Sequence, residues 1–575
     1  MSKGIHVGMV APSGSGIGPR VAYPFGMFDI HRRLALVNGR VYTQDAARPI
    51  AEAVAVVGNR IAHVGTTDDA RDAAGPRAEL IDLGGRAVVP GFVDAHFHLL
   101  GYCHERERLL LDGVESVTEV AALVRARAAS LPPDAWVLGR GWDRNLWPGA
   151  RFPTRDDLDA ASGGRPVMLL SRDVHAVWTN SVGLVRAGIA RATPDLPGGR
   201  IVRDAGGEPT GVLLESAGEA VRSLADRPST EASVGLLRAG QQALNAVGVT
   251  AVVNFEGKEA LRALHVLESA GDLTLRVSAG LTREGLDGAL AVGLGTGFGG
   301  ERVRIGLLKL FADGALGSGT AHMVEPYDDA PPGGTDARGI ATLEREELID
   351  LIRRARDGGI GVATHAIGDA AVRLVLDAAE VARRDHHPAA RTQILRVEHA
   401  QLVHSDDLAR FGRLGVVASM QPLHATSDML VADRRWGARC RTGYAWRSLL
   451  DAGAPLAFGT DCPVEPPDPL RGIHAATTRR RPDGEPPAGW YPEQRISVAE
   501  AIRAYTLDSA AAAGLDADLG SLAVGNLADL VALSHDPYVL DPSRILESSV
   551  DLTVFDGRVV HSAMPHVAVH THRAE

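Results

Sequence analysis

Short apolar runs separated by turn residues occupy both ends of the chain. LALVNGRVYT, AVAVVGNRIAHVG and AELIDLGGRAVV predict strands in the N-terminal part, and LADLVALS and VDLTVFDGRVVH predict strands near the C-terminus. Gly58-Asn59 and Asp556-Gly557 lie between apolar runs, where hairpin turns are expected. Strands from opposite ends of a chain can pair, so we expect one small β-sandwich built from both ends.

Between these ends, apolar runs alternate with helical patterns, which is typical of a parallel α/β sheet. Among the helical patterns, LEREELIDLIRRARDGG places Leu348, Leu351, Ile352 and Ala355 on one face and ends with the stop signal Gly358. Eight strand–helix units predict a (β/α)8 TIM-type barrel. The eight candidate strands are VVPGFVDAHFH, GVTAVVNF, LRVSAGL, VRIGLLKLF, GIGVATHA, ILRVEHA, GVVASMQP and PLAFGTD.

A long segment interrupts this alternation after the first barrel strand. Its sequences GWDRNLWPG and RPVMLLSRDVHAVWTNS are rich in aromatic and turn residues, which is typical of a lid or binding wall, so we expect an insertion over the barrel mouth. The predicted organisation is an N-terminal arm at 1–33, sandwich strands at 34–88, the barrel at 89–515 with the insertion at about 101–235, further sandwich strands at 516–565, and a tail at 566–575.

Composition narrows the class of protein. The 575 residues exceed one ordinary core, and 45% hydrophobic with 23% charged residues is a soluble globular composition. A net charge of -11 argues against nucleic acid or an anionic membrane as a partner. No window is apolar enough to span a bilayer, the N-terminus lacks a signal-peptide core, and the three cysteines form no CxxC pair. We therefore expect a cytoplasmic protein without a disulfide framework.

Residues that can bind metal stand on five of the eight predicted strands. Because the C-terminal ends of barrel strands meet at one mouth, these side chains should converge. The period of two places both histidines of a His-x-His on one face, and imidazole with carboxylate suits zinc. A bound ion lowers the pKa of water from 15.7 to about 7, and Asp461 could act as general base. The candidate ligands are His96, His98, Lys309, His365, His399 and Asp461, of which Asp461, His365 and His399 are also candidate catalytic residues.

This motif set resembles the amidohydrolase superfamily, and within it the amidohydrolase-3 (YtcJ-like) branch that includes N-substituted formamide deformylases. The resemblance rests on PGFVDAHFHL, GRGWDRNLWP, VHAVWTNS, LKLFADGALGS, VATHAIGDAAV, RVEHAQLV and GTDCPVEPPDP, and covers about residues 34–560. It implies that His96, His98 and Asp461 hold one divalent metal, with zinc expected. It also implies a second metal on His365 and His399, with carboxylated Lys309 as the bridge; one or two ions both fit.

Several further residues are candidates by position. Substrate-binding candidates are Asp143, His175, Trp178 and Asn180 in the insertion and His424 after the seventh strand. We expect Asp313 and Gly314 to shape the end of the fourth strand, and Cys103 and Cys462 to serve packing. Gly319 stands where the resemblance predicts arginine. GTGFGG precedes a strand, which argues against a nucleotide-binding loop, and the tail pair His570 and His572 predicts no more than adventitious metal binding.

Three functions remain open at this point. The leading one is hydrolysis of a carbon–nitrogen bond in a small amide, such as an N-substituted formamide or another N-acyl amine. A deaminase or cyclic amide hydrolase is the second, although the glutamate that such deaminases carry near the fifth-strand histidine is absent after His365. A non-catalytic scaffold is the third. The resemblance also suggests a homodimer.

Overall fold

The computed structural model describes residues 32–570 except 112, 172–175, 196–198, 226–229, 318, 331–336, 386 and 389–391. Three sequence-based predictions therefore fall outside the described residues: the arm up to residue 31, His175 of the insertion, and His572 of the tail. Among the described residues, no helix combines the length and apolar character needed to cross a membrane.

Eight parallel strands form the centre of the molecule, and each of the eight predicted apolar runs supplies one of them. They pair in the order β21-β20-β19-β18-β17-β16-β15-β8. Every residue of β8 and β15 is buried, as expected for a parallel sheet covered on both faces. The strands are β8 (Phe92–Phe97), β15 (Val249–Asn254), β16 (Arg276–Leu281), β17 (Val303–Phe311), β18 (Val362–Ala366), β19 (Leu395–His399), β20 (Val417–Met420) and β21 (Leu456–Phe458).

The first and last strands meet and close the sheet into a barrel. The Asp461 amide donates to the His96 carbonyl at 2.8 Å, and the His98 amide donates to the Cys462 carbonyl at 2.9 Å. On β8, the Asp94 carboxylate accepts from the amide of Thr460 at 3.0 Å and from its hydroxyl at 2.6 Å. The predicted TIM-type barrel is thus confirmed, and its closing seam runs beside the candidate ligands.

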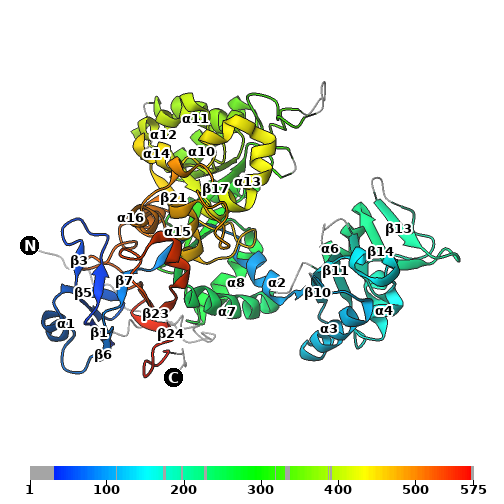
Figure 1. The fold of residues 1–575 in the computed structure, drawn as a ribbon, viewed down its shortest axis with the longest axis horizontal. Coiled ribbons are helices and arrows are strands. Elements are labelled where there is room, and N and C mark those ends of the chain that lie inside the picture. The colour runs from blue at the N-terminus through cyan, green and yellow to red at the C-terminus, as the bar shows by residue number, and fades with distance from the viewer. Residues whose placement is uncertain are drawn as a thin grey trace, which may run out of the picture.

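Helices surround the strands (Figure 1). The predicted helix is α10, in which Leu348, Leu351, Ile352 and Ala355 are buried and Gly358 is the C-cap. The helices are α2 (Leu99–Glu107), α7 (Thr230–Ala246), α8 (Lys258–Ser269), α9 (Leu286–Ala291), α10 (Arg345–Asp357), α11 (Asp369–Arg383), α12 (Leu408–Leu414), α13 (Pro422–Trp436), α14 (Trp446–Asp451), α15 (Pro469–Thr478), α16 (Val498–Ala504) and α17 (Leu507–Ala512).

Strands from both chain ends build two sheets on one side of the barrel. One has the order β5-β4-β1-β6, and the other, β24-β23-β22-β7-β2-β3, joins N-terminal to C-terminal strands through β7 and β22. At the β23–β24 hairpin, Asp556 and Gly557 have φ of 53° and 70°, the left-handed pair of a type I′ turn. The elements are β1 (Arg33–Val37), β2 (Arg40–Tyr42), β3 (Ile50–Ala51), β4 (Ala53–Val57), β5 (Arg60–Gly65), α1 (Thr67–Ala74), β6 (Glu79–Asp82), β7 (Ala87–Pro90), β22 (Leu530–Leu533), β23 (Val550–Phe555) and β24 (Arg558–Ser562).

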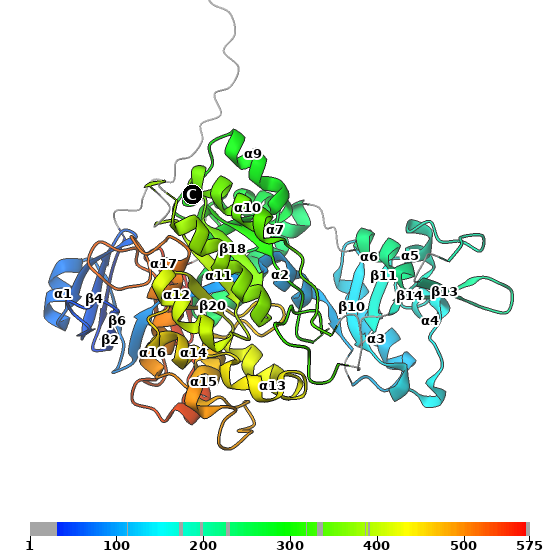
Figure 2. The ribbon, with the colours of Figure 1, turned by 90° about the horizontal axis from the view of Figure 1, so that it is seen from above.

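The insertion forms a module with its own sheet and cores, at residues 109–225. Figures 1 and 2 show it standing apart from the barrel, on the side away from the two end sheets. Its sheet has the order β13-β14-β12-β11-β10-β9. Its elements are β9 (Leu109–Leu110), α3 (Val117–Ser130), β10 (Val137–Trp142), α4 (Arg155–Asp159), β11 (Val167–Ser171), β12 (Ala176–Thr179), α5 (Ser181–Arg186), β13 (Gly199–Arg203), β14 (Pro209–Glu215) and α6 (Glu219–Ala225).

Candidate metal centre

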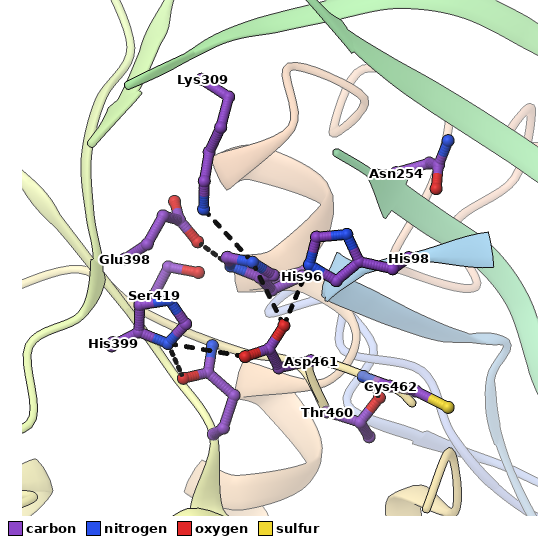
Figure 3. Close-up of polar contacts among 12 residues, drawn as sticks. His96, His98, Asn254, Lys309, Glu398, His399, Ser419, Thr460, Asp461 and Cys462 are labelled. Carbon is purple, nitrogen blue, oxygen red and sulfur yellow. Dashed lines mark hydrogen bonds and ion pairs between the residues drawn. The ribbon is translucent and has the colours of Figure 1, made fainter. Parts of the chain in front are cut away.

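The predicted ligands lie together at the C-terminal ends of the barrel strands, and Figure 3 shows five of the six, all except His365. Ligand atoms of His96, His399 and Asp461 lie within 4.8 Å of one another, and all three residues are buried. Around this core, Nε2 of His98 is 3.2 Å from Oδ1 of Asp461, and the ring centre of His365 is 4.5 Å from that of His399. Below, "candidate metal centre" denotes the side chains of His96, His98, Lys309, His365, His399 and Asp461.

Two of these residues have an unusual backbone. His399 and Asp461 have φ of 74° and 57°, in the left-handed region where non-glycine residues cost about 1–3 kcal/mol. At His399 this breaks the alternation of β19, since both Glu398 and His399 contact the same group of side chains: Glu398 bonds to His96, and the His399 ring centre is 4.8 Å from that of His96. The left-handed backbone at His399 therefore places the side chains of two consecutive residues, Glu398 and His399, in the same cluster.

The buried ion pair between Arg396 and Glu398 orients His96. Nδ1 of His96 donates to Oε2 of Glu398 at 2.7 Å, which leaves Nε2 facing Asp461 at 3.5 Å. Arg396 donates to both carboxylate oxygens of Glu398, at 2.7 and 2.9 Å. Burial raises the pKa of Glu398, but Arg396 and His96 outweigh it and hold that pKa well below its usual range. Sequence reasoning missed this pair, although Arg396 and Glu398 two positions apart in an apolar strand were a usable signal.

The rings of His399 and His365 are also fixed from outside the cluster. Nδ1 of His399 donates to the side-chain oxygen of Gln421 at 2.8 Å, and Nε2 of His365 donates to the Gly314 carbonyl at 2.9 Å. These bonds leave Nε2 of His399 and Nδ1 of His365 as acceptors. Burial and Lys309 lower the pKa of His365 to about 4, and burial and His365 lower that of His399 well below its ordinary value. Both rings are therefore neutral at pH 7, the form that binds metal.

The pKa values of Asp461 and Lys309 are also shifted from their ordinary values. Burial raises the pKa of Asp461, but His96 and the hydrogen bond from His98 lower it further, so that the pKa lies well below the ordinary value and the carboxylate is ionised. Burial lowers the pKa of Lys309 to about 8. Its Nζ lies 3.3 Å from Nε2 of His96 and 4.5 Å from the centre of the Phe255 ring.

The donor set suits a divalent transition metal. Neutral imidazoles and one carboxylate, brought together from separate strands, are zinc-type ligands. His424 adds an orphaned donor: it is buried, and its Nε2 has no hydrogen-bond partner while lying 4.0 Å from Oδ2 of Asp461. A buried polar atom without a partner is costly in a folded protein, so its position beside the cluster fits a ligand bound there.

The predicted substrate-binding residues separate into two groups. Of the described ones, His424 lies at the candidate metal centre, with its Nε2 4.0 Å from Oδ2 of Asp461. Trp178 is fully buried in the insertion module, where its Nε1 donates to the Thr154 carbonyl at 2.9 Å. Asn180 is also fully buried, as the N-cap of α5. Both side chains thus pack in the module's own core, and a contact of either residue with substrate stays a prediction. Asp143 directly follows β10 of the module.

Asp313 holds the loop that presents Gly314 to His365. Its carboxylate accepts from the amides of His322 at 2.9 Å, Ile367 at 3.0 Å and Gly368 at 2.8 Å. Burial raises its pKa to about 7. This ties the loop after β17 to the end of β18, as expected for a residue that shapes this strand end.

Known proteins resemble the chain over most of its length. The model of the amidohydrolase family matches residues 79–561, which include the whole candidate metal centre. YtcJ of Bacillus subtilis (strain 168), named as an amidohydrolase, is 33% identical over 91% of this chain and 98% of its own. The N-substituted formamide deformylase of Arthrobacter pascens is 30% identical over 92% of this chain and 98% of its own. The crystal structure of an uncharacterized metal-dependent hydrolase from Pyrococcus furiosus superposes with a TM-score of 0.75 at 33% identity, covering 88% of this chain and 100% of that one.

Proposed function

The chain belongs to the amidohydrolase family, and from that premise we propose that it is a metal-dependent hydrolase that cleaves the amide-type carbon–nitrogen bond of a small molecule. An N-substituted formamide is the first substrate to test, because a deformylase of such compounds is 30% identical over nearly the whole chain. The observation that carries the proposal is the convergence of His96, His399 and Asp461 at one point of the barrel mouth.

In this proposal the metal is zinc, as one or two ions. His96, His98 and Asp461 would hold the first, and His365 and His399 would hold the second. Lys309, once carboxylated, would add an oxygen ligand, which its buried amine with a pKa of about 8 supports, since carbamate formation requires the neutral amine. A divalent ion bound there supplies Lewis acidity and a water of lowered pKa.

The protein's own side chains bind the substrate and move the proton. Ionised Asp461 accepts the proton of the attacking water at a carboxylate oxygen and returns it to the leaving nitrogen. Its Oδ1 lies 3.2 Å from Nε2 of His98 and 3.5 Å from Nε2 of His96, so the carboxylate is placed among the proposed ligands. Gln401 Nε2 lies 3.4 Å from Nδ1 of His424, which makes Nδ1 the acceptor and leaves Nε2–H to donate to the substrate carbonyl oxygen.

Replacing the proposed base tests this function directly. We expect Asp461→Asn to lower kcat by about 10²- to 10⁴-fold, the usual contribution of general acid–base catalysis. The assay measures formate and amine released from N-butylformamide, with ammonia followed in parallel to detect deamination. Elemental analysis of the wild type gives metal per chain.

The matched control is His265→Asn, which alters an exposed side chain of α8 and should leave kcat unchanged. Full activity of the Asp461→Asn variant would exclude Asp461 as the base. A wild type that binds no stoichiometric zinc after reconstitution would overturn the metal-dependent hydrolase altogether.

A further inference from the structure

A pocket of about 310 Å³ opens beside the candidate metal centre. This volume is at the lower end of the range for small-molecule sites. The pocket lies over the C-terminal ends of three neighbouring strands, β15, β16 and β17. Its lining comprises Phe255, Thr282, Arg283, Glu284, Lys309, Leu310, Phe311, Thr342 and Leu343.

The pocket and the candidate metal centre share a wall. Lys309 and Phe311 are two positions apart on β17 and so point to the same face of the strand. The Phe255 ring centre lies 4.7 Å from that of His96, and the Phe311 ring centre lies 5.4 Å from that of His365. If the scissile bond of a substrate lies at the candidate metal centre, the substituent next to that bond would therefore lie in this pocket.

The chemistry of the walls favours an uncharged, flat group. Two phenyl rings provide the apolar surface, and Phe311 is 54% exposed, although the exposure of a large aromatic side chain to water is unfavourable. Two of the polar residues at the rim are already engaged. Thr342 donates its hydroxyl to the Phe311 carbonyl at 2.7 Å, and Arg283 pairs with Glu347, which is outside the lining. Aromatic side chains prefer aromatic partners in stacked or edge-to-face contact.

We propose that this pocket binds the apolar substituent of the substrate, an aryl ring against Phe255 and Phe311, while the amide lies at the candidate metal centre. The inference rests on the proposed function and narrows its substrate class to amides with an uncharged aromatic substituent. Phe255, after β15, and Phe311, at the end of β17, would then determine which substituent the enzyme prefers.

A matched pair of substrates tests the proposal. N-phenylformamide and N-cyclohexylformamide carry rings of the same number of carbons, but only the first ring is flat. We expect the wild type to prefer the phenyl compound in kcat/KM. Phe311→Ala should reduce that preference about tenfold, mainly through KM, and Thr282→Phe, which narrows the pocket from its opposite wall, should act in the same direction. Phe298→Ala, at another exposed phenylalanine, should keep the wild-type preference.

A binding measurement separates this proposal from the proposed function. Saturation-transfer NMR compares anisole with methoxycyclohexane, neither of which has a hydrolysable amide, and metal per chain is checked in each variant. Anisole should bind the wild type and lose about tenfold in affinity in Phe311→Ala. Binding without any amide turnover supports the pocket while the hydrolase proposal fails. Turnover without anisole binding, or an unchanged substrate preference in both pocket variants, overturns the pocket.

Discussion

At the residue scale, three histidines of the candidate metal centre each have a partner that fixes the tautomer of the ring. Glu398 accepts the Nδ1 proton of His96, Gln421 accepts that of His399, and the Gly314 carbonyl accepts the Nε2 proton of His365. Each bond selects one tautomer and directs the other ring nitrogen inward. Groups outside the cluster therefore hold these three rings in place.

Lys309 yields a pH-dependent prediction. Its pKa of about 8, lowered by burial, means that about half of its amine is neutral at pH 8 and about one part in a hundred at pH 6. Because only the neutral amine reacts with carbon dioxide, carbamate formation in the metal-free protein should increase as the pH rises through 8. We would measure the ¹³C carbamate signal after adding labelled bicarbonate, at constant dissolved carbon dioxide.

The control for this experiment is the exposed Lys258. Lys258→Ala should keep the carbamate signal, and Lys309→Ala should remove it. A signal that is lost in neither variant, or one that is already maximal at pH 6, would contradict the assignment to Lys309.

At the scale of the element, the start of α2 is held by residues that follow β15. The Leu99 amide donates to the Asn254 side chain at 2.8 Å, and the amides of Leu100 and Gly101 donate to the Glu256 carboxylate at 2.6 and 2.7 Å. These are the unpaired amides of a first helical turn, and His98, the N-cap, makes no side-chain cap of its own. Asn254 and Glu256 thus fix the helix end that carries a candidate ligand.

Removing this cap should weaken both the helix and the metal site. We expect Glu256→Ala to lower the free energy of unfolding by about 1–2 kcal/mol, the usual value of an N-cap interaction. Zinc affinity should fall as well, because His98 loses its anchored position. Denaturation and zinc titration measure the two effects.

Glu256→Gln should recover part of both losses, since one oxygen can still accept. Glu259→Ala removes an exposed carboxylate from the first turn of α8 and provides the matched control. If Glu256→Ala behaves like Glu259→Ala, the cap does not position His98.

The barrel could be predicted from the sequence because its strands are buried on both faces and appear as apolar runs. The candidate ligands could be found because they follow those runs. Glu398 and Gln421 were missed: a polar residue in an apolar strand or directly after one can be noticed, but the sequence gives no sign of which histidine it contacts across the barrel. The place of Trp178 in the module's core could not be predicted, because an aromatic residue in an insertion can fill the insertion's own core as readily as a binding wall.

At the scale of the whole molecule, a buried ion network joins the barrel to the sheets from both chain ends. Arg276, at the start of β16, donates to both oxygens of Asp529 at 2.7 and 2.9 Å and to Asp556 at 3.0 Å. Arg302 also pairs with Asp556, at 2.8 Å. The side chains of Arg276 and Asp529 are 4% and 0% exposed. One arginine of the barrel thus holds two carboxylates of the C-terminal strands.

We expect Asp529→Ala to destabilise the protein by about 3–5 kcal/mol, because it leaves Arg276 buried with only part of its charge compensated. The shift of the urea midpoint measures this. Glu547→Ala, which breaks an exposed pair with Arg544, should change stability by less than about 1 kcal/mol. Equal effects of the two substitutions would show that the network contributes no more than a surface pair.

The closing seam of the barrel also sets the order in which the site can be assembled during synthesis. His96 leaves the ribosome early, its partner Glu398 is 302 residues further along, and Asp461 comes later still. A growing chain therefore displays the first histidines long before any carboxylate can join them. The strands that complete the end sheets emerge last of all. The complete ligand set thus requires contacts between the most distant parts of the chain, which form slowly during folding. A nascent chain that ends before Asp461 therefore cannot form the complete cluster.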